Sequence, residues 1–134
     1  MFFNSYLGQR WRKPRTRWVA KYDLAILYNP AEKLPPSNKA ALNKFISVGK
    51  KLGINAELIE KKDFNRLAEY DALFIRETTA IEHHTYTFAK KARAEGMVVI
   101  DDPDSIVRCT NKVYLTELLQ TQRIPVPSTM ILTE

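Results

Sequence analysis

Residues 71–102, DALFIRETTAIEHHTYTFAKKARAEGMVVIDD, decide the fold that we predict for this chain. Residues 71–76 and 97–101 are short, nearly continuous apolar runs, a pattern typical of buried strands. Between them, apolar residues recur at helical spacing, so residues 83–95 predict a helix with one buried face. That face consists of Thr85, Phe88, Ala89 and Ala92. A strand, a helix and a second strand of these lengths predict two parallel strands joined by a crossover.

The same alternation begins earlier in the chain. Residues 22–28 (YDLAILY) predict a strand that is buried on both faces, and residues 54–59 predict another strand. A helix between them starts at a cap formed by Ser37 or Asn38 and ends at Gly53. Residues 61–70 predict a short helix or turn. Together these elements predict an α/β fold, a Rossmann-like open parallel sheet with helices on both faces.

The C-terminal part predicts further helical structure. Asp102 is a suitable helix cap, and Pro103 suits the first turn that follows it. Thr110 is expected to cap another helix, which carries three leucines on residues 115–119. The prolines at 125 and 127 end that helix.

Composition limits the function classes. The chain has 134 residues, 45% hydrophobic and 27% charged, which is the size and balance of one folded domain. The longest apolar runs are too short for a membrane helix, and no secretory signal pattern precedes them. Its single cysteine, Cys109, excludes an internal disulfide framework and an all-cysteine zinc site. These features predict a cytoplasmic protein that does not bind a membrane.

The net charge of +6 comes from one end of the chain. Residues 1–21 contain six basic residues and no acidic one, whereas basic and acidic residues balance in 22–134. We therefore divide the chain into a basic aromatic leader or linker, 1–21, and a domain, 22–134. The alternation of Arg and Trp in the leader suits RNA or single-stranded DNA, which keeps a nucleic-acid-binding or adaptor domain as the alternative function. The neutral charge of 22–134 favours a tether instead and disfavours nucleic acid as a partner.

A ligand site is expected beyond the carboxyl ends of the parallel strands. Arg76 ends one strand and is followed by Thr78 and Thr79, and Asp101 ends another. An arginine at this edge suits a carboxylate or phosphate, and the competing interpretation is that it only neutralises Asp101 or Glu77. The four scattered glycines form no phosphate-binding loop, and Arg76 stands where a phospho-acceptor domain needs an aspartate.

The two adjacent histidines and the single cysteine are further candidate reactive groups. His83 and His84 could ligate a metal or carry protons, but neighbouring helical residues diverge, which favours a capping or solvated role. Cys109 has no evident base partner, which favours a buried or passive thiol. A small independent enzyme that uses His83 or Cys109 is therefore the least favoured hypothesis.

Residues 71–132 resemble the N-terminal lobe of ATP-grasp ligases of the RimK and glutathione-synthetase type. Four pieces carry the resemblance in order: a strand that ends in Ile75-Arg76, the segment VIDDPDSI (99–106), CTNK (109–112) at a helix start, and IPVPST (124–129). The likeness extends back to about Lys21. The leader resembles the linker that joins an extra N-terminal domain to this lobe in some RimK-like proteins.

The resemblance implies an acid–amino-acid ligase activity. Such ligases use ATP and magnesium to activate a carboxylate as an acyl phosphate, which an amine then attacks. It implies that Lys112 faces the nucleotide phosphates and that Arg76, Thr78 and Thr79 receive a small-molecule or peptide carboxylate. The family's second ATP lysine and its magnesium ligands fall after Glu134. We therefore expect no catalytic or metal-binding residue in this chain, no tightly bound cofactor and no activity in isolation. The remaining ATP-grasp lobes are the expected partners, and pairing of two copies stays open.

Overall fold

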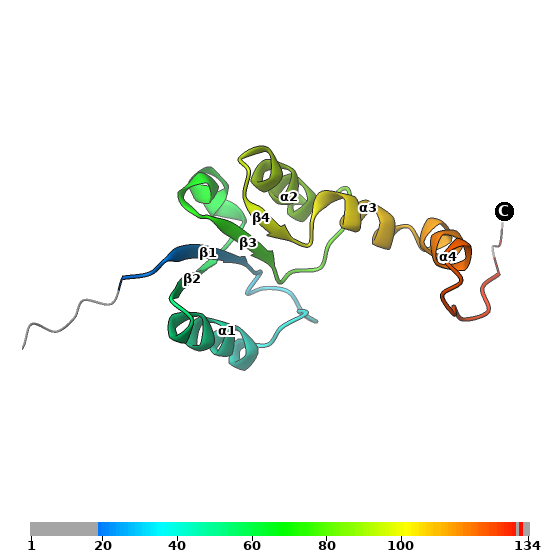
Figure 1. Cartoon of the computed structure of the whole chain (residues 1–134). Coiled ribbons are helices and arrows are strands. Elements are labelled where there is room, and N and C mark those ends of the chain that lie inside the picture. Colours follow the sequence, from blue (N-terminus) through cyan, green and yellow to red (C-terminus); the bar gives the residue numbers. More distant parts are fainter. Residues whose placement is uncertain (1–18, 131, 133–134) are drawn as a thin grey trace, which may run out of the picture.

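The computed structural model describes residues 19–130 and residue 132, so most of the predicted leader, 1–21, lies outside the described residues. Four strands form one sheet: β1 (Tyr22–Leu27), β2 (Ile54–Ile59), β3 (Ala72–Ile75) and β4 (Val98–Ile100). Their order is β2-β1-β3-β4, and each neighbouring pair is parallel. Helices lie on both faces of this open sheet, which confirms the predicted fold class (Figure 1).

Burial changes along the length of β1. The C-terminal half of β1 is fully buried, since Ala25, Ile26 and Leu27 are each 0% exposed. Tyr22, at the start of the same strand, is 60% exposed. The prediction of a strand buried on both faces is therefore correct only for residues 25–27 of the predicted 22–28.

One face of the sheet carries α1 (Lys39–Lys51). Its N-cap is Asn38, whose side-chain oxygen accepts a hydrogen bond from the backbone N–H of Ala41 at 2.9 Å. The helix packs directly on β2 at Gly49, where a Cβ would lie 3.4 Å from the carbonyl oxygen of Ile54, within ordinary van der Waals contact. Gly53 follows the helix with a φ of +80°, as its predicted role as a helix stop requires.

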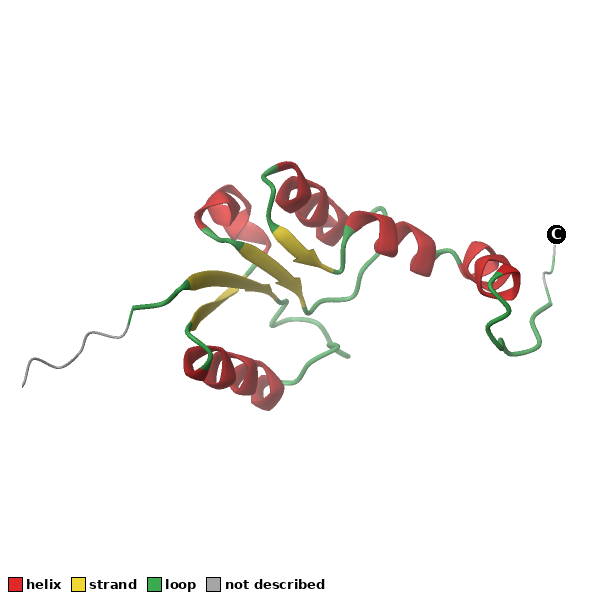
Figure 2. Cartoon of the chain, in the orientation of Figure 1, coloured by secondary structure: helices red, strands yellow, loops and turns green. Residues whose placement is uncertain are grey.

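The opposite face carries the 3₁₀ helix η1 (Lys61–Glu69) and α2 (His84–Ala94), as Figure 2 shows. All four residues predicted for the inner face of the second helix are buried, namely Thr85, Phe88, Ala89 and Ala92. Phe88 packs edge-on against Phe64 of η1, with ring centroids 5.0 Å apart. The main core of the described residues therefore lies between the sheet and α2.

Two helices follow the sheet. The first, α3 (Pro103–Thr110), starts at the predicted cap Asp102, whose carboxylate accepts from the N–H groups of Asp104 and Ser105. The cap predicted for the next helix, α4 (Lys112–Thr121), is wrong: Asn111 is the N-cap, and its side chain accepts from the N–H of Tyr114. Thr110 instead ends α3, where its hydroxyl donates to the carbonyl of Ile106 at 2.7 Å.

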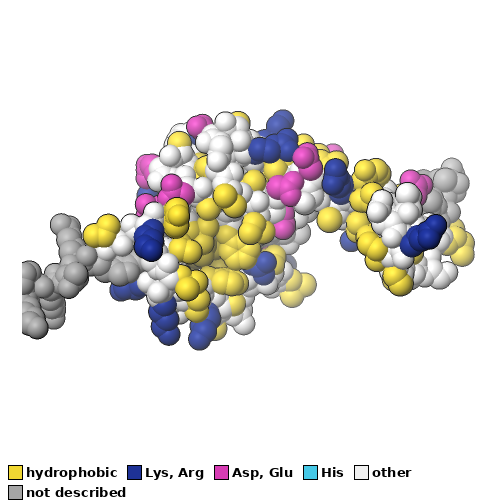
Figure 3. All heavy atoms as spheres, viewed as in Figure 1, with side chains coloured by type: hydrophobic (Ala, Val, Ile, Leu, Met, Phe, Trp, Pro, Cys, Tyr) yellow, Lys and Arg dark blue, Asp and Glu magenta, His cyan; other side chains and the backbone are white. Residues whose placement is uncertain are grey.

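The sheet face that carries α1 is only partly covered by the helix. Over β3 and β4 it forms an open apolar hollow of about 270 Å³, and Figure 3 shows hydrophobic side chains gathered there. Val98 and Ile100 of β4 are 68% and 55% exposed in it. Among the described residues, no helix has both the length and the apolar character that crossing a bilayer requires.

Candidate functional site

The sheet order defines where a ligand crevice should form. The chain leaves β1 toward β2 on one side and later returns to place β3 on the other side of β1. Crevices in open α/β sheets form at such a reversal, beyond the carboxyl ends of the two strands. Tyr28 and Asn29 follow β1 at this point, and Arg76 and Glu77 follow β3.

A groove at this edge collects the residues singled out in the sequence. We call it the Arg76–Lys112 groove, an open hollow of about 530 Å³. Arg76, Thr78, Thr79 and Lys112 all line it, although 36 positions separate the first from the last. It is completed by Pro36, Ile75, Glu77, Ala80, Asp101, Cys109 and Thr110.

Arg76 is tied to the loop that precedes α1. Its Nε donates to the hydroxyl of Ser37 at 2.8 Å, and its Nη2 donates to the carbonyl of Pro36 at 2.8 Å. The guanidinium also lies 5.2 Å from the ring centroid of Phe74. Among the described residues it forms no ion pair, so the interpretation that it only neutralises Asp101 or Glu77 is wrong. Two of its five N–H groups are engaged, and three remain without a partner in the described part of the chain.

The two threonines differ in what they offer. The backbone N–H of Thr78 points at the carboxylate of Glu32, at 3.3 and 3.4 Å from its two oxygens, and the Thr78 hydroxyl donates to the same group. Glu32 therefore already occupies the hydrogen-bonding groups of Thr78. Thr79 is half-buried on the groove and has no hydrogen-bond partner within the described residues.

Lys112 and Cys109 lie on the far side of the groove. Lys112 is the first residue of α4, where helix N–H groups and its ammonium together favour an anion. It is exposed and forms no ion pair with another described residue. Cys109 lies in the last turn of α3 and is exposed, so of the two predicted alternatives the buried thiol is wrong, and the passive thiol stays a prediction.

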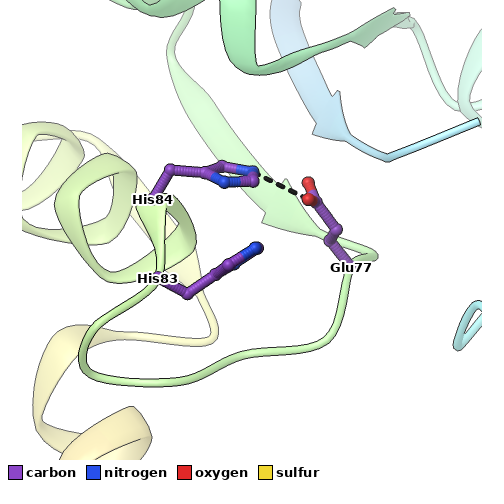
Figure 4. Close-up of side chains that lie close together, drawn as sticks. All are labelled: Glu77, His83 and His84. Carbon is purple, nitrogen blue, oxygen red and sulfur yellow. Dashed lines mark ion pairs between the residues drawn. The ribbon is translucent and has the colours of Figure 1, made fainter. Parts of the chain in front are cut away.

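A second group of side chains adjoins the groove at Glu77, and the sequence analysis identified only part of it. His83 and His84 both point toward the carboxylate of Glu77 (Figure 4). The expected divergence of the two imidazoles does not occur, because His83 is the N-cap of α2 with extended backbone, at φ −97° and ψ 155°. Their ring centroids are 3.9 Å apart. His83 occupies the predicted cap position, but its side chain makes no capping hydrogen bond, and both histidines are half-buried rather than solvated.

Burial and charge act on the acid–base properties of this edge of the sheet. The pKa of His83 is lowered, first because burial disfavours the charged imidazolium and then because His84 and Lys61 lie nearby. The pKa of Asp102 is also lowered, since the side chain and backbone of Ser105 donate hydrogen bonds to its carboxylate. His83 is therefore held neutral near neutral pH, and Asp102, the cap of α3, is held ionised.

Comparison with known proteins connects this fold to a ligase. No protein-family model matches the chain. It is 31% identical over 99 residues to the alpha-aminoadipate–LysW ligase LysX of Saccharolobus solfataricus. The chain is similar to part of a ligase. The match covers 64% of this chain and 33% of LysX, so it spans about a third of the length of that relative. The expected relation to ligases is confirmed at this level.

Proposed function

We propose that this chain is the substrate-side lobe of an ATP-dependent carboxylate–amine ligase of the RimK-like ATP-grasp type. The observation that carries the proposal is that Arg76 and Lys112, the two cations implied by the resemblance, line one groove at the carboxyl ends of parallel strands. The similarity to LysX supports the same reaction class. The domain in this proposal comprises residues 22–134, with 1–21 as its linker.

The groove suits an acidic substrate. Arg76 is held in place by Ser37 and Pro36 and keeps three N–H groups for a carboxylate, which a planar guanidinium binds through two parallel hydrogen bonds. Thr79 offers a hydroxyl on the same wall. Thr78 serves chiefly to hold Glu32, which makes it a positioning residue in this scheme.

Lys112 lies across the groove, at the start of α4. In the proposed ligase it faces the phosphates of ATP, while magnesium and the remaining phosphate ligands belong to the ATP-clamping lobes. Phosphoryl transfer depends mainly on positioning and on charge neutralisation by such groups. The lobe is therefore proposed to bind the acceptor carboxylate and to be inactive without its partner lobes.

Binding to the isolated chain tests this proposal. In a ¹⁵N NMR titration, a small dicarboxylate such as glutarate should shift the amide signals of residues 76–80 and 109–112 at millimolar concentration. Arg76→Lys should weaken the shifts, because an ammonium cannot form the two parallel hydrogen bonds of a guanidinium. Lys112→Met should remove shifts induced by inorganic triphosphate, whereas Lys44→Met, an equal change of charge on α1, should not.

Two results would overturn the proposal. In one, neither anion perturbs the groove at the highest soluble concentration. In the other, all anion-induced shifts fall on residues 1–21, and an RNA oligonucleotide binds there with steep salt dependence, which would favour the nucleic-acid-binding alternative.

A further inference from the structure

The side chains of Glu77, His83 and His84 form a cluster that the proposed ligase chemistry does not use. Each offers one ligating atom, and all three atoms lie within 4.8 Å of one another. We propose that this cluster is a binding site for one divalent transition-metal ion, with Zn²⁺ as the best-suited ion. The inference does not depend on the ligase proposal.

The carboxylate of Glu77 supplies the first reason. Its side chain is 2% exposed, and neither of its oxygens has a hydrogen-bond partner among the described residues. The Nε2 of His84 lies 2.7 Å from Oε1, yet the orientation is not that of a hydrogen bond. A buried carboxylate without donors is costly unless a cation compensates its charge. A metal ion bound to one carboxylate oxygen of Glu77 and to Nε2 of His84 would satisfy two of the three orphaned atoms and compensate the buried charge.

The distances supply the second reason. Tetrahedral zinc with bonds of about 2.1 Å separates its ligand atoms by about 3.4 Å. The ligating atoms of Glu77 and His84 are 2.7 Å apart, and no two of the three ligating atoms are more than 4.8 Å apart. These separations bracket the value for tetrahedral zinc, so the proposed site needs only small displacements of the three ligating atoms.

A buried hydroxyl supplies the third reason. The Nδ1 of His83 lies 3.2 Å from the hydroxyl of Thr85, a residue that is 0% exposed. Metal-bound histidines usually donate their second ring N–H to such an oxygen, which fixes the tautomer and the ring orientation. With Nδ1 engaged by Thr85, Nε2 is the His83 nitrogen left for the metal.

The cluster also opens onto space for a fourth ligand. Glu77 and His84 line a hollow of about 510 Å³, together with Tyr28, Asn29, Pro30, Glu60, Lys61 and Lys62. Three protein ligands with one open position are the arrangement of zinc sites that bind water or a substrate. Lys62 on the rim is paired with Glu60 at 3.2 Å, whereas Lys61 forms no ion pair with another described residue and favours an anionic fourth ligand, a carboxylate or phosphate oxygen. Two imidazole nitrogens select Zn²⁺ over Mg²⁺, which prefers oxygen ligands.

The sequence makes the test unusually specific. His83 and His84 are the only histidines of the chain, and residues 1–18 contain no Cys, His, Asp or Glu. Every imidazole signal of the tag-free 134-residue protein therefore reports on this cluster. Adding ZnCl₂ to the chelator-treated protein should shift the ring nitrogens of both histidines in ¹⁵N NMR, and calorimetry should give one Zn²⁺ per chain.

Variants locate the site. We expect His84→Ala and Glu77→Gln to weaken Zn²⁺ binding by about 100-fold or more, since loss of an outer-shell partner already costs 10–100-fold. Glu82→Gln, a neighbouring exposed carboxylate outside the cluster, should bind Zn²⁺ as the parent does. Cys109→Ser should also leave the affinity unchanged, because the single thiol lies outside the cluster.

The measurement on the parent protein keeps the proposal open to refutation even if a variant fails to fold. It is overturned if the folded parent binds no stoichiometric Zn²⁺, or if Zn²⁺ binds while both histidine rings keep their metal-free signals. In the second case Zn²⁺ is bound elsewhere on the chain. Retention of full affinity by folded His84→Ala would overturn it equally.

Discussion

Replacement of Arg76 by alanine should destabilise the fold. The guanidinium holds the loop before α1 against the end of β3 through Ser37 and Pro36, and it lies over the ring of Phe74. A hydrogen bond from a charged donor contributes about 1.5–3 kcal/mol, and a cation–π contact contributes about 0.5–1 kcal/mol. Because Arg76 is half-buried, solvent screens part of this sum. We expect Arg76→Ala to lower the free energy of unfolding by about 2–4 kcal/mol.

Urea unfolding of the 134-residue chain, followed by circular dichroism, measures this loss. Arg76→Lys is the matched control: it keeps the charge but loses the fork of donors, so it should lose about 1–2 kcal/mol. A double-mutant cycle with Ser37→Ala should give a coupling free energy of about 1 kcal/mol, since Ser37 is 7% exposed and its hydroxyl accepts directly from Nε.

The contrary result is equally informative. If Arg76→Ala stays within about 0.5 kcal/mol of the parent, the guanidinium does not hold the loop. The hydrogen bonds to Ser37 and Pro36 would then not explain why the guanidinium lies where it does. A coupling free energy near zero would lead to the same conclusion for Ser37 alone.

Three further predictions test the core, a helix cap and a buried phenol. Phe88→Ala should lower the free energy of unfolding in urea by about 3–5 kcal/mol, because the ring is 1% exposed and packs on Phe64. Phe88→Leu, the milder control, should lower it by less than about 1.5 kcal/mol, and a loss that small for Phe88→Ala would contradict the prediction. Asp102→Ala should cost about 1 kcal/mol at pH 7, and Asp102→Asn, which still caps, should cost less. Because the pKa of Asp102 is lowered in the fold, the ionised carboxylate stabilises the fold above the ordinary carboxyl pKa. The cost of Asp102→Ala should therefore shrink as the pH falls toward and through the lowered value, and a cost that stays constant through the acid range would refute the account. Burial, and next the nearby Glu57, raise the pKa of Tyr70 from 10.0 to about 12. The neutral phenol therefore stabilises the fold fully below pH 10. Between pH 9 and 11 the free energy of unfolding of the parent should fall by about 1 kcal/mol, a loss that Tyr70→Phe should not show. Equal losses in both proteins would show that Tyr70 does not titrate differently in the fold.

Features set by short stretches of sequence were predictable. These features are the inner face of α2, a cap at Ser37 or Asn38, the cap and proline at residues 102–103 and the left-handed Gly53. Each depends on residues within about one or two helical turns. The same local patterns predicted parallel strands, because a helix of that length between two apolar strands acts as a crossover. The cap predicted at Thr110 was wrong because the adjacent Asn111 can also cap, and only the position at which α4 begins distinguishes the two residues.

Contacts between distant residues were decided by the tertiary structure. Arg76 binds residues about forty positions earlier, and Glu77 meets two histidines of another element, so neither pairing leaves a periodic signal in the sequence. The uncovered apolar face over β3 and β4 likewise depends on which strands α1 reaches. Sequence by itself determined which segments become strands and helices and which residues end the strands. The order β2-β1-β3-β4 decided which of those ends face one another, because the packing of whole elements, rather than any local preference, sets the neighbours of each strand.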